Sequence, residues 1–276
     1  MRYISIPKPG KVSIENCAIP APGKGEALLR LLYGGICGSD LGTYKGTFLY
    51  ASYPRIPGHE FSAEIAEVAP NEYGLEKGMI VTANPYFNCG TCYSCQRGYV
   101  NCCVHNETMG SQRDGAFREY ITMPVGKIYH GKGLSPEKLA LIEPFCISYH
   151  AAKRAQIKTG DRVLVVGSGT IGCLAIAAAK MLGAKVYASD ISAFKLEKAK
   201  LFGATDVYVN NCSDGFLEWV DKITGGNGFD VCMEAAGLPG TFQNCIDAAA
   251  YQGRVVVIGI GKQSLDFRYS VIQTKE

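Results

Sequence analysis

The sequence lacks the features of a secreted, membrane-spanning or nucleic-acid-binding protein. Its first ten residues, MRYISIPKPG, contain no continuous apolar stretch of the kind that forms a secretory signal. The most apolar helical window, residues 171–184, is interrupted by Lys180 and is shorter than the roughly 20 residues that span a bilayer. The 28 basic and 25 acidic residues give a net charge of +3 and form no basic stripe. We therefore expect a cytoplasmic protein that binds neither membrane nor nucleic acid.

Internal repeats and low-complexity tracts are also missing, and the length of 276 residues suits about two globular domains. With 47% hydrophobic residues, the chain can bury a substantial core. Cysteine is abundant, with 12 residues, but a chain of this length does not need a disulfide scaffold. Five of the cysteines lie between residues 89 and 103, enough to supply the four ligands of a metal site, which this crowding indicates rather than a set of disulfides.

The two halves of the sequence differ in the spacing of their apolar runs. Up to about residue 145, short runs alternate with glycine and proline, which predicts strands of a β-rich domain at residues 26–33, 60–68, 79–83 and 117–123. From about residue 160, segments of helical character such as residues 192–202 separate the runs, and we expect strands at residues 163–166, 185–188, 207–209, 231–233 and 255–258. This pattern predicts an α/β chain with a β-rich domain at residues 1–145 and a doubly wound parallel sheet at residues 146–276.

A glycine-rich loop follows the first strand of the second half, with the sequence Gly167-Ser168-Gly169-Thr170-Ile171-Gly172. The first glycine permits a tight turn, the second lets the backbone approach a pyrophosphate, and the third lets the helix pack close to the strand. Asp190 ends the next strand and is placed to bind ribose hydroxyls, which favours NAD over NADP. The alternative is a structural turn with Asp190 as a helix cap. The predicted NAD contacts are Gly167, Gly169, Thr170, Ile171, Gly172, Asp190 and Lys195.

The cysteine-rich loop has the pattern C-x-x-C-x-x-C-x7-C, formed by Cys89, Cys92, Cys95 and Cys103. Four thiolates at this spacing can surround a tetrahedral ion, and a closed four-sulfur shell is typical of structural zinc. Cys102 is an alternative to Cys103 as the fourth ligand. A zinc-ribbon nucleic-acid binder is a rival interpretation, but Arg97 is the only basic residue between residues 87 and 107.

Two further motifs place candidate ligands at strand or turn ends, namely Gly35-Ile36-Cys37-Gly38-Ser39-Asp40 and Gly58-His59-Glu60. A lone cysteine or histidine of this kind would normally be interpreted as a packing residue. These motifs, the four-cysteine loop, Ile142-Glu143-Pro144 and the glycine-rich loop occur in the order found in zinc-containing medium-chain alcohol dehydrogenases. Essentially the whole chain resembles this family, which implies a GroES-like catalytic domain followed by a Rossmann NAD-binding domain.

The resemblance implies a second, catalytic zinc ion. Cys37 and His59 would be its ligands, with Glu60 and Glu143 as carboxylates that bind directly or through water. One coordination position would stay open for the alcohol, whose pKa the metal lowers so that hydride can leave toward the nicotinamide.

The resemblance also implies how protons are handled. Asp40 would hold His59 in one tautomer, and Ser39 would take the proton of the substrate hydroxyl. Many relatives have a histidine of the proton relay where this sequence has Gly42. We expect the relay to run through Ser39, a cofactor hydroxyl and water instead.

Several short sequence segments resemble those of the polyol and sugar-acid branch of the family, especially hexonate 5-dehydrogenases acting on L-galactonate or L-gulonate. They are Tyr53-Pro54-Arg55, Asn101-Cys102-Cys103, the segment 110–115 and Ile142-Glu143-Pro144-Phe145. An anionic substrate would require a cation, which Arg55 or Arg113 would supply unless it is structural. Threonine dehydrogenase is the alternative enzyme, whereas a zinc-free quinone reductase disagrees with the cysteine and histidine motifs.

The family also implies a homodimer or homotetramer. Its members continue beyond the position of Glu276, with a final strand and helices that return to the catalytic domain. We therefore expect a truncated chain, since ending at this point would expose an unpaired sheet edge. The exact substrate and the physiological direction do not follow from the sequence.

Overall fold

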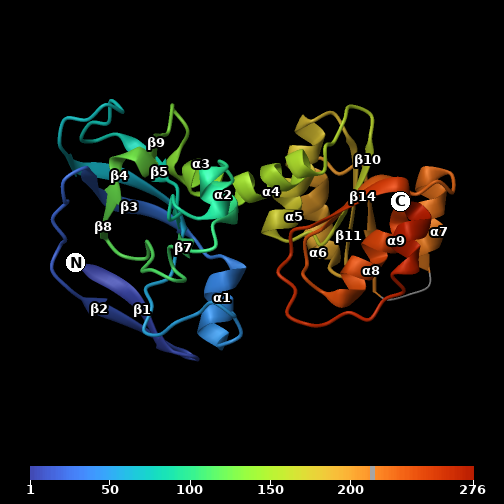
Figure 1. Ribbon diagram of the computed structural model, residues 1–276, viewed down its shortest axis with the longest axis horizontal. Coiled ribbons are helices and arrows are strands. Elements are labelled where there is room, and N and C mark those ends of the chain that lie inside the picture. The colour runs from blue at the N-terminus through green and yellow to red at the C-terminus, as the bar shows by residue number, and fades with distance from the viewer. Residues whose placement is uncertain (212–214) are drawn as a thin grey trace. The chain divides into compact units, whose positions relative to one another are not determined.

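The computed structural model describes residues 1–211 and 215–276, which divide into two compact units, Met1–Glu143 and Pro144–Glu276. Each unit has its own five-stranded sheet and its own core (Figure 1). Within the described ranges, no helix is long and apolar enough to cross a membrane.

Unit 1 is built around an antiparallel sheet with the strand order β8-β3-β4-β5-β9. The strands are β3 (Glu26–Gly35), β4 (Glu60–Val68), β5 (Ile80–Ala83), β8 (Tyr120–Pro124) and β9 (Ile128–His130). Their apolar side chains close a core that includes Leu29, Phe61, Ile65, Val81 and Ile121. Gly35 pairs with Glu60, so the end of β3 lies beside the start of β4. This register brings the segments that contain Cys37 and His59 together.

Shorter elements complete unit 1. They are the hairpin of β1 (Arg2–Lys8) and β2 (Lys11–Asn16), the pair β6 (Tyr86–Phe87) and β7 (Glu107–Thr108), and the helices α1 (Gly38–Lys45), α2 (Tyr93–Gln96) and α3 (Pro136–Ala140). Two 3-10 turns, η1 (Val100–Cys102) and η2 (Val125–Lys127), also occur. Helix α4 (Ile142–Arg154) begins at the last residues of unit 1 and continues in unit 2.

The strand expected at residues 117–123 begins later, at Tyr120. The residues before it pair with a loop instead: the amide of Ala116 donates to Gly58 O at 2.9 Å and that of Phe117 to Pro57 O at 3.0 Å. Residues 117–119 are half-buried, and the carbonyl of Glu119 still accepts the amide of Leu31 in β3 at 3.0 Å. The consequence is that the loop carrying His59 is fixed by main-chain hydrogen bonds.

Unit 2 contains a parallel sheet with the strand order β12-β11-β10-β13-β14. Its strands are β10 (Arg162–Val166), β11 (Lys185–Asp190), β12 (Asp206–Val209), β13 (Phe229–Glu234) and β14 (Ala249–Val257). The last strand begins six residues before the expected run at residues 255–258, because Ala249 already pairs with Phe229 before an irregularity in the register.

Helices cover both faces of this sheet. Val163 and Val165 of β10 belong to one buried cluster, whereas Leu164 and Val166 belong to another. Alternation of this kind shows that the strand is buried on both sides, as in a doubly wound fold. The helices are α5 (Thr170–Met181), α6 (Ala193–Leu201), α7 (Gly215–Thr224), α8 (Pro239–Ala248) and α9 (Ser270–Lys275). Helix α6 matches the helical segment expected at residues 192–202, and the hydroxyl of Ser192 caps it by accepting the Lys195 amide.

Candidate functional site

Cys37, His59 and Glu60 meet at the junction of β3, α1 and β4. Cys37 occupies the N-cap position of α1, and Glu60 is the first residue of β4. Their possible ligand atoms all lie within 4.8 Å of one another. His59 and Glu60 are buried, each with 7% of its surface exposed. A thiolate, an imidazole and a carboxylate at such separations suit a tetrahedral zinc ion with one position left for another ligand.

Asp40 connects the two segments that supply these side chains. One carboxylate oxygen accepts the amide of Cys37 at 2.9 Å, and the other accepts the amide of Gly58 at 3.1 Å. The distance from Asp40 Oδ1 to His59 Nδ1 is 4.0 Å, which is longer than a hydrogen bond. Nδ1 has no other hydrogen-bond partner among the described residues. Asp40 therefore aligns the backbone on both sides of the group rather than bonding the imidazole directly.

The electrostatics of the group favour a positive charge. Burial opposes protonation of His59, but the Cys37 thiol and the charges of Asp40 and Glu143 outweigh it and raise the pKa of His59 to about 9. Burial is also the main cause that raises the pKa of Glu60. The negative charges that favour a protonated His59 would also stabilise a metal cation between these side chains, so the residues fit a metal ion.

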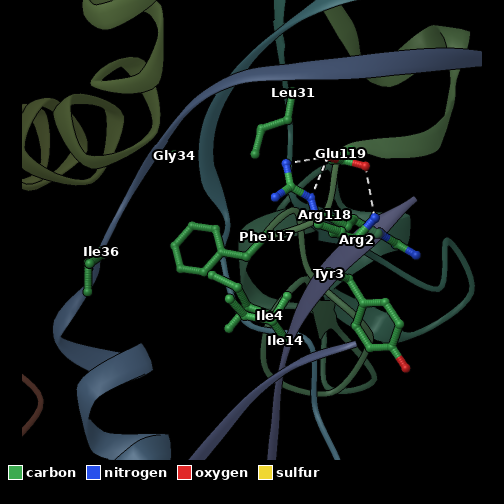
Figure 2. A pocket seen from close by; sticks show the side chains of 10 residues that line it. All are labelled: Arg2, Tyr3, Ile4, Ile14, Leu31, Gly34, Ile36, Phe117, Arg118 and Glu119. Atoms are coloured by element: carbon green, nitrogen blue, oxygen red, sulfur yellow. Dashed lines mark hydrogen bonds and ion pairs between the residues drawn. The ribbon is translucent and has the colours of Figure 1, made fainter. Parts of the chain in front are cut away.

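Close packing explains two glycines of this region. A Cβ at Gly35 would overlap the carboxylate of Glu60, and a Cβ at Gly58 would overlap the ring of Phe117. Gly58 also has a φ of +97°, which disfavours other residues. Phe117, Gly34 and Ile36 line a neighbouring pocket of about 420 Å³ in unit 1, drawn in Figure 2. Its ten lining residues include none of the predicted metal ligands.

Glu143 is separate from the three-ligand group. It is buried in the first turn of α4, and its Oε1 accepts a hydrogen bond from the hydroxyl of Tyr86. Burial raises the pKa of Glu143, while the hydrogen bond from Tyr86 and the charge of His59 act in the opposite direction. Burial and the charge of Glu143 raise the pKa of Tyr86 well above its ordinary value, so the phenol stays a hydrogen-bond donor.

Tyr86 was not predicted from the sequence. It lies three residues before Cys89 in a segment whose spacing carries no ligand signal, and only the fold brings it to Glu143. Ser39 lies in the first turn of α1, half-buried and two residues from Cys37. Gly42 is buried on the same helix.

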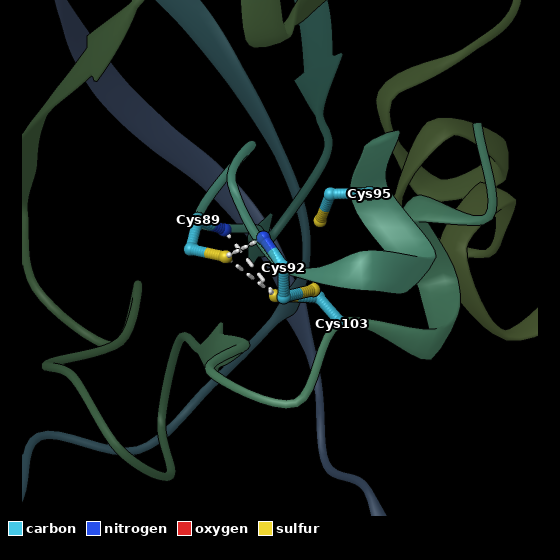
Figure 3. Close-up of side chains that lie close together, drawn as sticks. All are labelled: Cys89, Cys92, Cys95 and Cys103. Carbon is cyan, nitrogen blue, oxygen red and sulfur yellow. Dashed lines mark hydrogen bonds between the residues drawn. The ribbon is translucent and has the colours of Figure 1, made fainter. Parts of the chain in front are cut away.

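The four cysteines of the loop converge as the spacing predicts (Figure 3). The structure groups Cys103 with Cys89, Cys92 and Cys95, whereas Cys102 is exposed beside Asn101. Cys89 Sγ lies 3.5 Å from Cys103 Sγ, and the amides of Cys92 and Cys89 donate to Cys89 Sγ and Cys103 Sγ respectively, each at 3.3 Å.

Hydrogen bonds prepare two of these thiols for deprotonation. The hydroxyl and amide of Thr91 and the amide of Cys92 lower the pKa of Cys89 to about 5. Amides also lower the pKa of Cys92, whereas desolvation raises that of Cys95 to about 11. Thiolates held by amide donors are the form that binds zinc, so this loop also fits a metal ion.

In unit 2, the three glycines of the glycine-rich loop have distinct environments. Gly167 has a φ of +97°, and a Cβ at Gly172 would overlap the carbonyl of Gly167. A Cβ at Gly169, the N-cap of α5, would meet no described atom within 4 Å. The N-terminus of α5 therefore faces open space at Gly169, as a pyrophosphate requires.

Asp190 has more partners than the sequence suggested. Its carboxylate accepts the amide of Ser168 at 2.7 Å and that of Ser192 at 2.8 Å. Lys195 Nζ lies 4.0 Å from Asp190 Oδ2 and is half-exposed. Asp190 thus ties the glycine-rich loop to the start of α6, and Lys195 places a cation beside the predicted ribose site.

The chain is similar to known proteins over its whole length. A family model described as an alcohol dehydrogenase GroES-like domain matches residues 23–132, and one described as a zinc-binding dehydrogenase matches residues 170–276. L-Galactonate-5-dehydrogenase of Escherichia coli K12 is 35% identical over 279 residues, which cover 100% of this chain and 81% of the relative. The chain belongs to the zinc-type medium-chain alcohol dehydrogenase family.

Other members of this dehydrogenase family are about equally similar. L-Threonine 3-dehydrogenase of Pyrococcus horikoshii is 36% identical over 273 residues, which cover 96% of this chain and 78% of the relative. The solved structure of galactitol-1-phosphate dehydrogenase from Escherichia coli has a TM-score of 0.91 and 30% identity, and covers 99% of this chain and 79% of its own. The predicted family and the GroES-like and Rossmann folds are therefore confirmed.

Two further solved structures of similar proteins hold cofactors. A zinc-binding dehydrogenase from Sinorhizobium meliloti is bound to NADP, with a TM-score of 0.91, 30% identity, and coverage of 99% of this chain and 81% of its own. An alcohol dehydrogenase from Escherichia coli CFT073 is complexed with NADH, with a TM-score of 0.90, 31% identity, and coverage of 100% and 81%. The chain is thus an oxidoreductase of a zinc-dependent family whose cofactors are nicotinamide dinucleotides.

Proposed function

We propose that the dehydrogenase transfers hydride between NAD and a secondary hydroxyl, or the corresponding ketone, of a polyol or sugar acid. The observation that carries the proposal is the group of Cys37, His59 and Glu60, three ligands of different chemistry within 4.8 Å of one another in a buried position. Similarity to an L-galactonate dehydrogenase and to sorbitol dehydrogenases supports the substrate class.

Each residue of the site has a proposed role. Cys37, His59 and Glu60 hold the catalytic zinc, which when bound lowers the pKa of a coordinated hydroxyl and polarises a carbonyl. Asp40 keeps the two ligand segments aligned through the amides of Cys37 and Gly58. Ser39 accepts the substrate proton, and burial of the group excludes water from it. Separately, the four-cysteine group holds a structural zinc ion.

The nucleotide side of the proposal concerns unit 2. The start of α5 binds the pyrophosphate of the dinucleotide, which supplies the hydride acceptor when bound. Asp190 favours NAD because its charge disfavours the additional phosphate of NADP. The contacts of Asp190 with the Ser168 and Ser192 amides hold the carboxylate beside the predicted ribose position.

The two arginines considered for a substrate carboxylate already have partners. Arg55 donates to Asp114 at 3.1 Å and to Ser52, and only 14% of its side chain is exposed. The Arg113 guanidinium lies 3.6 Å from the centre of the Phe87 ring and 3.6 Å from Glu107. Neither offers an uncommitted guanidinium, so we propose that recognition relies on the hydroxyl groups that polyols and sugar acids share.

A substrate panel tests the proposal. Zinc-loaded protein is assayed for NAD reduction with hexonates, polyols, polyol phosphates and L-threonine, and we expect the highest kcat/KM with a polyol or a hexonate. Threonine oxidation is the second candidate because the 36% identity to a threonine dehydrogenase supports it equally well. A clear preference for threonine would replace the proposed substrate class.

Quaternary structure and location also stay proposals. We propose a homodimer or homotetramer in the cytoplasm, as the family resemblance implies. Sedimentation at micromolar concentration measures the assembly, and a monomer that is fully active would contradict it.

A further inference from the structure

The sequence predicts four metal ligands at the catalytic site, and the structure brings only three of them together. Cys37, His59 and Glu60 form one group, whereas Glu143 is not part of it. Glu143 is 8% exposed, and its carboxylate is engaged by the Tyr86 hydroxyl. Glu143 follows α3 by three residues, and α3 packs against β3 and β4, the strands that lead to Cys37 and begin with Glu60. The hydrogen bond from Tyr86 therefore fixes the position of a carboxylate that lies outside the group.

Tyr86 is held firmly enough to do so. Its amide donates to Asn84 Oδ1 at 2.9 Å, and its carbonyl accepts Lys127 Nζ at 2.6 Å. The strand β6 also pairs Tyr86 with Thr108 of β7. Because the backbone is fixed on both sides, the phenol has a defined position and its single proton points to Glu143 Oε1.

A buried carboxylate requires partners that compensate for lost hydration. In this structure, the neutral hydroxyl of Tyr86 is one such partner, because it donates a hydrogen bond to Glu143. Without that hydrogen bond, a cation held by Cys37, His59 and Glu60 would offer Glu143 a replacement partner. The phenol therefore competes with the metal for the same oxygen.

We propose that Tyr86 is a positioning residue that holds Glu143 outside the Cys37–His59–Glu60 ligand set and so keeps the fourth coordination position free for substrate. The inference rests on the proposed function, because it assumes that these three residues bind the catalytic zinc. The inference assigns to Tyr86 the choice between two roles of Glu143, which binds the metal either directly or only through water.

The first test uses Glu143→Gln, which retains the shape and the hydrogen-bond acceptor for Tyr86. Zinc affinity of the catalytic site is measured by competition with a chromophoric chelator. If Glu143 is not a ligand, we expect Glu143→Gln to lose less than about tenfold in affinity through the lost charge alone, because loss of a direct ligand or its close support costs about 10- to 100-fold. A loss of that larger size would overturn the proposal without any need for a Tyr86 variant.

The second test uses Tyr86→Phe, with Tyr129→Phe as the control because Tyr129 is exposed on β9. We expect Tyr86→Phe to bind zinc roughly tenfold more tightly, since Glu143 becomes an additional ligand. Its kcat/KM should fall by about the same factor because substrate must displace that ligand. The double variant Tyr86→Phe with Glu143→Gln should return the zinc affinity to that of Glu143→Gln alone.

A spectroscopic measurement shows the ligand set directly. Cobalt replaces zinc, and the spectrum of the catalytic site is taken as the difference between each protein and its Cys37→Ala version, which leaves cobalt in the four-cysteine site. Wild type, Tyr129→Phe and Glu143→Gln should give the intense visible bands of four-coordinate cobalt. Tyr86→Phe should give the weaker bands of a five-coordinate ion.

The outcomes separate the two proposals. If Cys37→Ala binds as much metal as wild type, the zinc site assumed by the proposed function is wrong. If Cys37→Ala loses one metal ion but Tyr86→Phe matches wild type in affinity and spectrum, the site is right and the role of Tyr86 is wrong.

Discussion

The two metal-ligand groups of unit 1 are constructed in different ways. The four-cysteine group lies on one loop, with its first and last members 14 residues apart, and amide donors surround its sulfurs. The group of Cys37, His59 and Glu60 joins the ends of two strands and lies among buried carboxylates. A closed set of identical ligands suits a structural ion, whereas a mixed, three-membered set leaves room for a reacting molecule. The comparison suggests that one ion serves folding and the other serves chemistry.

The largest effect should come from removing a ligand of the mixed group. In Cys37→Ala or His59→Ala, loss of the Lewis acid should lower kcat by about 10³-fold or more, since it contributes several kcal/mol to the reaction. Affinity for NADH, measured by fluorescence titration, should stay within about twofold because unit 2 binds the dinucleotide. Variants that keep wild-type turnover with the metal still bound would place the chemistry elsewhere.

An intermediate effect is expected from the closed group. Cys89→Ser removes the sulfur whose hydrogen bonds lower its pKa to about 5, and it should lose one zinc ion per chain. Stability should fall by about 3 kcal/mol, equivalent to a decrease in Tm of roughly 6–12 °C in calorimetry. Cys102→Ser is the matched control and should leave both values unchanged, because Cys102 lies outside the group. Equal effects of the two substitutions would contradict the assignment.

The smallest effect concerns unit 2 and should leave both metal groups intact. Asp190→Ala removes the charge that disfavours NADP, so the ratio of kcat/KM for NAD over NADP should fall by about tenfold. Steady-state kinetics with both cofactors checks this, with zinc content as the control. Wild-type protein that uses both cofactors equally well would disprove the preference.

Local sequence patterns predicted the ligands that lie close together in the chain, but not the contacts between distant residues. The cysteine loop was recognisable because its ligands are close in sequence, and the structure adds the choice of Cys103 over Cys102. The bond between Tyr86 and Glu143 joins residues 57 positions apart. No periodicity encodes that distance, since it depends on how β6 and the start of α4 are placed. Cys37 and His59 were predicted only through the family resemblance, for the same reason.

The same difference between local pattern and long-range contact applies to the strands of the fold. Strand β4 has the predicted bounds because apolar residues recur along it up to Val68 and Gly58 lies two residues before its start. The start of β8 was predicted three residues too early because the apolar residues Ala116 and Phe117 bond through their main chain to Gly58 and Pro57 instead of to the sheet. Side-chain pattern reports burial, whereas the partner of a main-chain amide depends on tertiary structure.

Zinc stoichiometry tests the central distinction between the two groups most directly. Zinc content is measured by inductively coupled plasma mass spectrometry in wild type, Cys37→Ala, Cys89→Ser and the double variant. We predict about two zinc ions per chain in wild type, one in each single variant and none in the double variant. Cys37→Ala should also keep the wild-type Tm within about 2 °C, whereas Cys89→Ser should not. A single zinc ion in wild type, or loss of both ions in either single variant, would contradict two independent sites.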